Sequence, residues 1–451
     1  MESKADVVAL AAPVAEKPKG QGSANYSRAV ALLHQHDADY TAPELPFPLF
    51  SPALEAEWAK NGPPAFGAEM RKWFHFKEGV HFLNHGSYGA MPRPVKQIHA
   101  QWLDHVEEQP CRWFNCELFP LISHAVRGLA KFIGAKPHEV VFARNATTAI
   151  NAILRSFPFQ LGDALLCMNF TYGAIKKTLQ YVLPRQKVDI IEVQIDSHPT
   201  GRQVIDKIKE ALENDKEKKI RVVLLDHIIS PLGMKELVEL IHAHGARALV
   251  DGAHVVGQVP LNLHELNADY FVSNCHKWLY APRGCAFAWV KEELHKEVRP
   301  AVISHGYDQG FHSEFIWQAT DDYTPFLSVV SAIKFVELCG AEKIMAYSNE
   351  LVTDAANELA KAWDTEVVVP PADFAAMALI RMPKPAHHDE DGQGADAICQ
   401  LLWDDFKIEA MIFPLPELGL VVRISGQIYL EKQDYAHFAD AVLTLIREGR
   451  Y

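Results

Sequence analysis

One stretch, residues 246–287, constrains the fold and the chemistry of this chain more than any other. It contains two short apolar runs. The first, residues 248–250, stops at Asp251, and the second, residues 269–273, stops shortly before Lys277. Short apolar runs closed by turn residues predict buried strands of a parallel sheet. Ligands of such sheets bind beyond the carboxyl ends of the strands. We therefore expect Asp251 and Lys277 to point into the same crevice.

A buried lysine beside a carboxylate requires a chemical reason, because burying charge is costly. An amine that forms a Schiff base and an acid that pairs with a pyridinium nitrogen supply that reason. Lys277 and Asp251 therefore predict pyridoxal 5'-phosphate as the cofactor. The alternative is that Asp251 caps a helix and Lys277 lies on the surface. It is disfavoured because both residues end apolar strands.

Three motifs in this stretch resemble a known family: Asp251-Gly-Ala-His254, Ser273-Asn-Cys-His-Lys277-Trp and Pro282-Arg-Gly284. They resemble the class V aminotransferase family, whose enzymes have fold type I of the pyridoxal-phosphate enzymes. The chain is most similar to the branch of L-cysteine desulfhydrases, hercynylcysteine sulfoxide lyases of ergothioneine synthesis and isopenicillin N epimerases. The resemblance covers most of the chain, from about Val80 to near the C-terminus.

Length and resemblance together predict the domain organisation. A chain of 451 residues exceeds what one hydrophobic core usually holds. The resemblance implies an α/β fold: a large cofactor domain with a mainly parallel seven-stranded sheet, and a smaller C-terminal α/β domain. We expect a flexible tail (residues 1–23) and an arm over residues 1–75, the large domain over 76–325 and the small domain over 326–451. The arm is expected to contain a short helix near residues 51–60.

Composition excludes several classes of partner. The net charge of −13 comes without a basic stripe, which disfavours nucleic acid. No apolar run approaches the about 20 residues of a membrane span. The seven cysteines are scattered without metal-ligand spacing, so we expect reduced thiols, a cytoplasmic location and no metal site. Residues 387–394 combine histidines with acids, but a solvated loop is the favoured interpretation.

A second ligand-binding pattern follows the predicted strand at residues 139–142. Small polar residues that open a helix leave N–H groups free, and the helix dipole favours an anion there. A helix cap without a ligand would explain this segment alone, but not beside Lys277. The resemblance implies that the cofactor phosphate is held by the backbone of Ala146, Thr147 and Thr148, by the Thr147 hydroxyl, and by Asn274 and His276.

The resemblance also assigns the residues around the ring and the substrate. It implies that Tyr172 stacks on the cofactor ring and acts as an acid or hydrogen-bond donor. It places His227 at the phenolic oxygen and His254 in the cofactor site. A partner's Thr320 would reach the phosphate across a homodimer with shared active sites, although Gln318-Ala319 departs from the usual Thr-Gly. The substrate carboxylate would be held by Asn84 and Arg423.

The predicted reaction acts on a small amino acid. Lys277 removes the α-proton, and a sulfur group on Cβ then leaves by β-elimination. We favour carbon–sulfur cleavage of cysteine or a sulfoxide, which releases sulfide or sulfenate, pyruvate and ammonia. An epimerase is the alternative, and a third is a catalytically impaired relative, because the loop at residues 232–234 is shorter than in the family. A persulfide route is disfavoured, since residues 411–422 contain no cysteine and Cys399 lies in a predicted helix.

Overall fold

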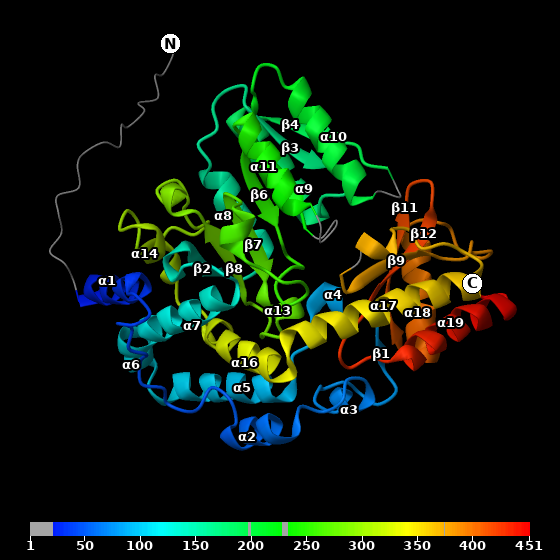
Figure 1. Cartoon of the computed structure of the whole chain (residues 1–451), viewed down its shortest axis with the longest axis horizontal. Coiled ribbons are helices and arrows are strands. Elements are labelled where there is room, and N and C mark those ends of the chain that lie inside the picture. The colour runs from blue at the N-terminus through cyan, green and yellow to red at the C-terminus, as the bar shows by residue number, and fades with distance from the viewer. Residues whose placement is uncertain (1–20, 197–199, 228–232, 374) are drawn as a thin grey trace, which may run out of the picture.

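The computed structural model describes residues 21–196, 200–227, 233–373 and 375–451 (Figure 1). Its larger part is built on a seven-stranded sheet with the order β2-β8-β7-β6-β5-β3-β4. The strand pairs β3–β4, β3–β5, β5–β6 and β6–β7 are parallel, whereas β8 is antiparallel to both β2 and β7. The predicted mainly parallel seven-stranded sheet is therefore confirmed. The strands are β2 (Val140–Ala143), β3 (Ala164–Met168), β4 (Asp189–Val193), β5 (Ile220–Asp226), β6 (Arg247–Asp251), β7 (Tyr270–Asn274) and β8 (Ala286–Val290).

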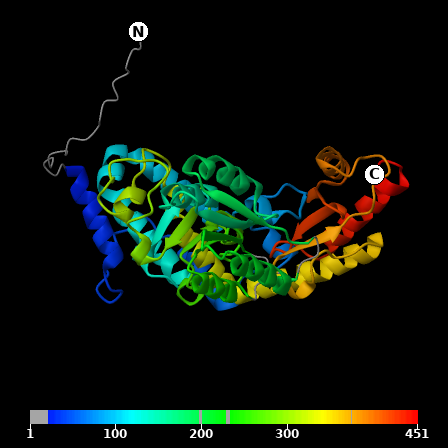
Figure 2. The same ribbon diagram turned by 90° about the horizontal axis from the view of Figure 1, so that it is seen from above.

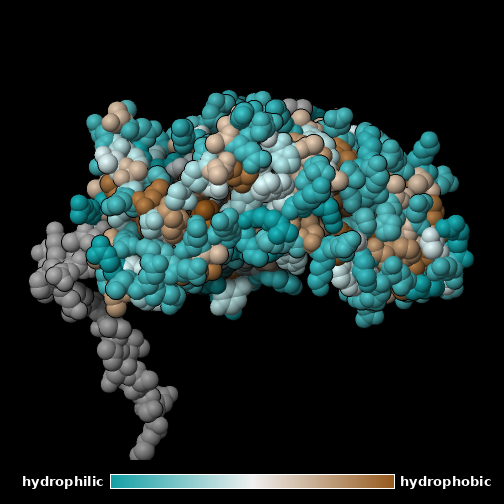
Figure 3. All heavy atoms as spheres, turned by 90° about the horizontal axis from the view of Figure 1, so that it is seen from below, coloured by the Kyte–Doolittle hydropathy of each residue, from teal (hydrophilic) through white to brown (hydrophobic). Residues whose placement is uncertain are grey.

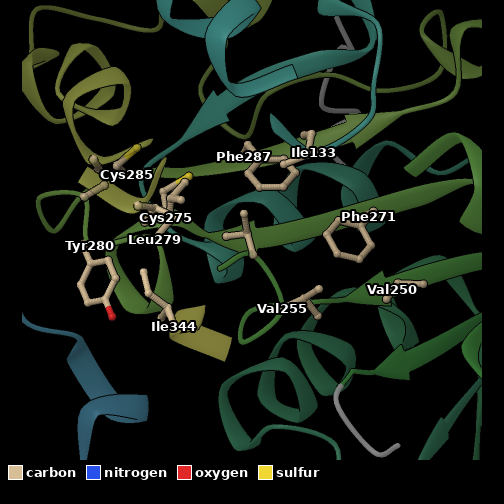
Figure 4. Close-up of a cluster of buried hydrophobic side chains, with 14 of the residues drawn as sticks. Ile133, Val250, Val255, Phe271, Cys275, Leu279, Tyr280, Cys285, Phe287 and Ile344 are labelled. Carbon is tan, nitrogen blue, oxygen red and sulfur yellow. The ribbon is translucent and has the colours of Figure 1, made fainter. Parts of the chain in front are cut away.

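Both faces of this sheet are covered by helices, which explains why its inner strands are mainly apolar rather than alternating, whereas the edge strand β4 is mostly exposed. All five residues of β3, β7 and β8 are buried. Val250, Phe271 and Phe287 lie on one face, where Figure 4 shows them within one apolar cluster. Leu249 and Tyr270 belong to the cluster on the other face. The first face is covered by α7 (Leu118–Phe132), α10 (Gly201–Asn214), α11 (Met234–His244) and α16 (Val329–Cys339), and the second by α8 (Ala146–Ser156) and α9 (Gly173–Val182).

The C-terminal part contains a three-stranded antiparallel sheet with the order β11-β12-β9. Helices pack on it, and the long helix α17 contacts both β9 and α19. Figure 2 shows this part at one end of an elongated molecule, with α1 at the other end. The elements are α17 (Ala341–Trp363), β9 (Met377–Arg381), α18 (Gly392–Phe406), β11 (Met411–Leu415), β12 (Gly419–Ser425) and α19 (Lys432–Arg447).

Two contacts cross the predicted domain limits at residues 76 and 326. Strand β1 (His81–Phe82) pairs in parallel with β10 (Ile408–Glu409), so an early segment joins the C-terminal part. Helix α16 packs on α7 and on α5 (Arg93–Glu108), which belong to the larger part. The limits stay predictions, and these contacts favour a boundary near Gly340, between α16 and α17.

The N-terminal region is more ordered than the sequence predicts. Helix α1 (Gln21–His34) begins inside the predicted flexible tail, whose first 20 residues lie outside the described part. The helix packs on α7, because the Ser123 hydroxyl donates to the Ala29 carbonyl at 2.9 Å. The short helix expected near residues 51–60 is confirmed as α2 (Pro52–Asn61), whose N-cap Ser51 accepts a hydrogen bond from Leu54.

The surface fits the acidic composition. Seen from below, hydrophilic residues cover most of the molecule and hydrophobic ones are scattered among them (Figure 3). Within the described ranges, no single helix is long and apolar enough to cross a membrane. Only the bent pair Thr324–Cys339 and Ala341–Trp363 satisfies that test together, by length and composition alone.

Candidate active site

Asp251 and Lys277 come from neighbouring strands, as the sequence predicts. Asp251 is the last residue of β6, and Lys277 lies in the one-turn helix α13 (Cys275–Trp278) that follows β7. Because β6 and β7 are parallel neighbours, both residues stand at the carboxyl edge of the sheet. Their charges influence each other, since Asp251 favours the protonated form of Lys277.

Lys277 lies in an environment that favours its neutral amine. Burial and the positive charge of Arg423 lower the pKa of Lys277 to about 8, although the Asp251 carboxylate opposes this shift. The Lys277 Nζ atom lies 3.1 Å from Nε2 of His254. At neutral pH, a useful fraction of this amine is therefore unprotonated and nucleophilic.

Asp251 is 5% exposed, and within the described residues the charge of Lys277 favours its ionised form. Burial and the neighbouring Asp226 carboxylate raise the pKa of Asp251 to about 7, while the Ala253 N–H at 3.1 Å opposes the rise. Asp226 is held by the Thr171 hydroxyl at 2.6 Å and the Tyr172 N–H at 3.1 Å. A buried carboxyl whose pKa is raised is stabilised as a carboxylate by a further positive charge, and a protonated pyridine nitrogen has that charge.

Two further buried groups in this crevice have unsatisfied hydrogen bonds. His227 Nδ1 and Arg423 Nε are buried without a partner among the described residues. Burial lowers the pKa of His227 to about 4, so its ring is neutral at physiological pH. Native proteins rarely leave buried polar atoms unpaired. These atoms, with Asp251 and Lys277, fit a polar, aromatic and anionic ligand such as pyridoxal phosphate.

The helix expected to bind the phosphate begins as predicted, but two of its N–H groups are already used. Helix α8 starts at Ala146, whose N–H donates to Asn274 Oδ1 at 2.9 Å. The Thr148 N–H donates to Oδ1 of its N-cap Asn145 at 2.8 Å. In this structure asparagine oxygens therefore accept the amides of Ala146 and Thr148, as they commonly do at helix starts, and the phosphate contacts of both residues stay predictions. Thr147 stays the predicted phosphate ligand, whereas Asn274 here orders the helix start.

Three other predicted cofactor residues lie at different depths. The His276 Nδ1–H donates to the Cys285 carbonyl at 3.0 Å, and burial lowers the pKa of His276 to about 4. Tyr172 precedes α9 and is 61% exposed, so its ring is free to cover a flat ligand. Thr320 lies exposed in the loop after α14 (Phe311–Ile316), next to Asp321, which pairs with Arg144 just after β2.

Arg423 and Asn84 meet although they lie 339 residues apart in the sequence. Arg423 on β12 donates from Nη2 to Asn84 Oδ1 at 3.1 Å and to the Ser87 hydroxyl at 3.0 Å. Ser87 in turn donates to Asn84 at 2.8 Å. Burial lowers the pKa of Arg423, which stays cationic. A buried guanidinium with no carboxylate among these contacts is suited to an incoming carboxylate.

Sequence reasoning missed the residues that support this site. His85 is fully buried and donates from Nε2 to the Lys277 carbonyl at 2.9 Å, while its Nδ1 lies 2.9 Å from the Tyr429 hydroxyl. Gly89 has a φ of 66°, and a Cβ there would lie 2.0 Å from the His276 carbonyl oxygen. The resemblance assigns only Asn84 in this segment, and no local pattern indicates that residues 84–89 also contact the backbone of His276 and Lys277.

A cleft of about 630 Å³ adjoins Arg423. It lies between the ends of β3 and β4 and the three-stranded sheet, and its apolar lining includes Phe170, Met377, Leu379 and Phe413. Cysteine would occupy a small part of this volume. The site therefore has room for a substituent on the substrate.

The fold and this site define a pyridoxal-phosphate enzyme of fold type I. Its sequence matches the profile of the aminotransferase class-V family over residues 115–392. The chain belongs to the class V aminotransferase family, as the sequence motifs indicated.

Named relatives and a solved structure give this result more detail. The chain is 30% identical to a probable chloroplastic L-cysteine desulfhydrase of Arabidopsis thaliana, over 81% of this chain and 83% of that protein. It is 26% identical to hercynylcysteine sulfoxide lyase of Schizosaccharomyces pombe, over 84% and 97%. A cysteine desulfurase from Thermococcus onnurineus NA1 superposes with a TM-score of 0.70 at 18% identity, over 84% of this chain and 98% of that one. This last similarity confirms the fold.

Proposed function

We propose that this protein is a pyridoxal-phosphate-dependent carbon–sulfur lyase acting on L-cysteine or a cysteine-type substrate such as a sulfoxide. The observation that carries the proposal is the Lys277 amine, whose pKa is lowered, near the Arg423 guanidinium, which has no carboxylate partner among the described residues. The names of the relatives, a cysteine desulfhydrase and a sulfoxide lyase, support the choice of sulfur substrates.

Each residue has a proposed part in the reaction. Arg423 and Asn84 hold the substrate carboxylate, which fixes the Cα–H bond toward Lys277. When bound, pyridoxal phosphate takes up the electron pair left on Cα. The freed Lys277 amine accepts the α-proton, and Asp251 keeps a positive charge on the pyridine nitrogen. The Cβ–S bond then breaks, and water completes the conversion to pyruvate and ammonia.

The remaining cofactor contacts belong to the same proposal. The Thr147 N–H and hydroxyl hold the phosphate. His276, which precedes Lys277 in α13, also binds the phosphate in this proposal. Tyr172 covers the ring, while His227 and His254 face its polar edge. We also propose a homodimer in which Thr320 of one chain, exposed in the described structure, reaches the partner's phosphate. A cytoplasmic location stays a prediction from the cysteine pattern.

A product assay tests the proposal directly. Purified protein with pyridoxal phosphate is incubated with L-cysteine while sulfide, pyruvate and optical rotation are followed. Sulfide and pyruvate in equal amounts would support the lyase. Loss of optical rotation without sulfide would favour the epimerase. No reaction with cysteine or its sulfoxides would favour an impaired relative with a shortened loop at residues 232–234, of which Leu232 lies outside the described residues.

Substituting Arg423 by lysine should weaken substrate binding while preserving the charge. Lysine cannot reproduce the two-pronged contact of a guanidinium with a carboxylate. Losing one charge-assisted hydrogen bond costs about 1.5–3 kcal/mol, so we expect KM to rise roughly 10- to 100-fold with a smaller change in kcat. The matched control is Arg381→Lys, an exposed arginine on neighbouring β9. An unchanged KM in Arg423→Lys would show that Arg423 does not bind the substrate carboxylate.

Substituting Cys399 by serine should leave sulfide release within roughly twofold of the wild type. Cys399 lies in α18, its Sγ is 3.8 Å from the Ala410 carbonyl, and burial raises the pKa of its thiol. A thiol of this kind is a poor nucleophile. The measurement compares sulfide and protein-bound persulfide in Cys399→Ser and the wild type. If sulfide release is lost while cofactor binding is kept, a persulfide route through Cys399 must replace β-elimination.

A further inference from the structure

A chain of two hydrogen bonds joins Trp278, His254 and Lys277. The indole Nε1 of Trp278 donates to Nδ1 of His254 at 3.3 Å. On the other side of the same imidazole, Nε2 lies 3.1 Å from Nζ of Lys277. Trp278 is the residue after Lys277 in α13, whereas His254 follows β6. The two hydrogen bonds therefore connect the segments that follow β6 and β7.

The direction of the first bond determines the direction of the second. An indole nitrogen always carries its hydrogen and can only donate, so His254 Nδ1 must be the acceptor. Burial and the charges of Lys277 and Arg423 hold the pKa of His254 well below its usual value, so the ring is neutral. Its single hydrogen must then be on Nε2, where it points to Lys277. An ammonium group has no lone pair to accept this hydrogen, whereas a neutral amine has one.

We infer that Trp278 is a positioning residue that fixes the tautomer of His254 and thereby keeps Lys277 as a free amine. The inference rests on the proposed function, because the free amine is the form that reacts with the cofactor. Its nitrogen lone pair forms a C=N bond with the cofactor aldehyde carbon, and the two amine hydrogens leave with the carbonyl oxygen as water. The same lone pair accepts the substrate α-proton later in the cycle.

Packing keeps both rings in this orientation. Trp278 is 3% exposed, and its indole lies against the His85 ring, with 4.9 Å between the ring centroids. The His254 carbonyl accepts a hydrogen bond from Gln258 at 2.6 Å, which holds the backbone of the histidine. The indole of Trp278 cannot turn over without displacing the His85 ring.

Burial and two opposed charges act on Lys277 and lower its pKa to about 8, so a hydrogen bond to its amine can shift its protonation state. The Asp251 carboxylate favours the ammonium form, whereas Arg423 disfavours it. The imidazoles of His85 and His276 also face His254. If Trp278 no longer donated, His254 could carry its hydrogen on Nδ1 and accept from an ammonium group with Nε2. The charged form of Lys277 would then gain a hydrogen bond, and its pKa would rise.

The tautomer itself can be measured on the cofactor-free protein. Histidine-selective ¹⁵N labelling distinguishes a protonated ring nitrogen from an unprotonated one by chemical shift, and His254→Gln identifies the signals by their loss. We expect His254 to carry its hydrogen on Nε2 in the wild type and to gain an Nδ1–H population in Trp278→Phe. An Nδ1–H ring in the wild type would overturn the inference. The wild-type part of this measurement needs neither activity nor a folded Trp278 variant.

The effect on Lys277 is tested by the pH dependence of cofactor uptake. Cofactor-free protein is mixed with pyridoxal phosphate, and the rate at which the visible absorbance of the lysine-bound form appears is measured from pH 6 to 10. We expect Trp278→Phe to raise the midpoint of this pH dependence by about one pH unit. Below the midpoints of both proteins, cofactor uptake by the variant should be about tenfold slower than by the wild type. The matched control is Trp102→Phe, because Trp102 is equally buried and its Nε1 has no partner among the described residues.

The outcomes separate this inference from the proposed function. Equal midpoints in Trp278→Phe and the wild type would overturn the role of Trp278. In the His254→Gln background, Trp278→Phe should produce no further shift, because the tryptophan acts through the histidine. A further shift there would contradict the mechanism. If the wild type takes up no cofactor at any pH, the proposed function fails, and the ¹⁵N measurement alone decides the tautomer.

Discussion

Replacing Lys277 by alanine should lower turnover about 10⁴-fold or more and abolish covalent attachment of the cofactor. The amine is expected both to hold the cofactor and to accept the α-proton, so its loss removes two contributions to catalysis. Cofactor binding should persist in a noncovalent form, because Thr147 and Asp251 are unaffected. Pyruvate release and the visible absorbance of the purified variant measure the two effects separately.

The control for this experiment is Lys432→Ala, which removes a lysine from the far side of the C-terminal part. Lys432 is exposed and pairs with Asp354, and exposed ion pairs contribute little to stability. This variant should retain the absorbance and turnover of the wild type. Turnover by Lys277→Ala near the wild-type rate would contradict the placement of the active site, whatever the absorbance showed.

Replacing Asp251 by asparagine should stabilise the cofactor-free protein and impair the enzyme. Its folded-state pKa, about 7, lies above the ordinary 3.8, so the folded state binds the proton more tightly. Stability due to this group is therefore full below about pH 4 and is lost as the pH rises through 7. Asparagine does not titrate and keeps an oxygen for the Ala253 N–H. We expect the unfolding free energy above pH 7 to rise by up to about 4 kcal/mol.

The same substitution should lower turnover about 10²- to 10³-fold, because a neutral amide cannot stabilise charge on the pyridine nitrogen. Chemical denaturation of the cofactor-free protein at pH 5 and pH 8 measures the stability, and pyruvate release measures the activity. The gain in stability should be larger at pH 8 than at pH 5. A gain that is equal at both pH values would show that the carboxyl of Asp251 does not titrate in this range.

The main strands and the centre of the site were predictable because their signals are local. Apolar runs that end at Asp251 and shortly before Lys277 identify buried parallel strands, and parallel strands bring their carboxyl ends together. The structure places both residues there. The meeting of Asn84 with Arg423 came from the family resemblance rather than from any pattern within the chain.

The details that escaped prediction depend on competition between groups distant in sequence. Helix α8 has the expected sequence at its start, yet the side chain of Asn274, the last residue of β7, accepts the Ala146 N–H. Nothing near Ser87 indicates that its hydroxyl would contact Arg423. The two hydrogen bonds of His254 require the exact placement of an indole and an amine, which only the folded chain defines.

The pairing of β1 with β10 has a consequence for the synthesis of the protein. The carboxylate-binding group joins Asn84 to Arg423, and Leu83 accepts the N–H of Ser425, so the first and last thirds of the chain must meet. Contacts over such sequence distances form slowly, since a long loop must close first. An emerging chain can complete the central sheet and the segment that carries Lys277 well before β12 has been synthesised. The proposed carboxylate site, which includes Arg423 on β12, therefore forms after the proposed cofactor site.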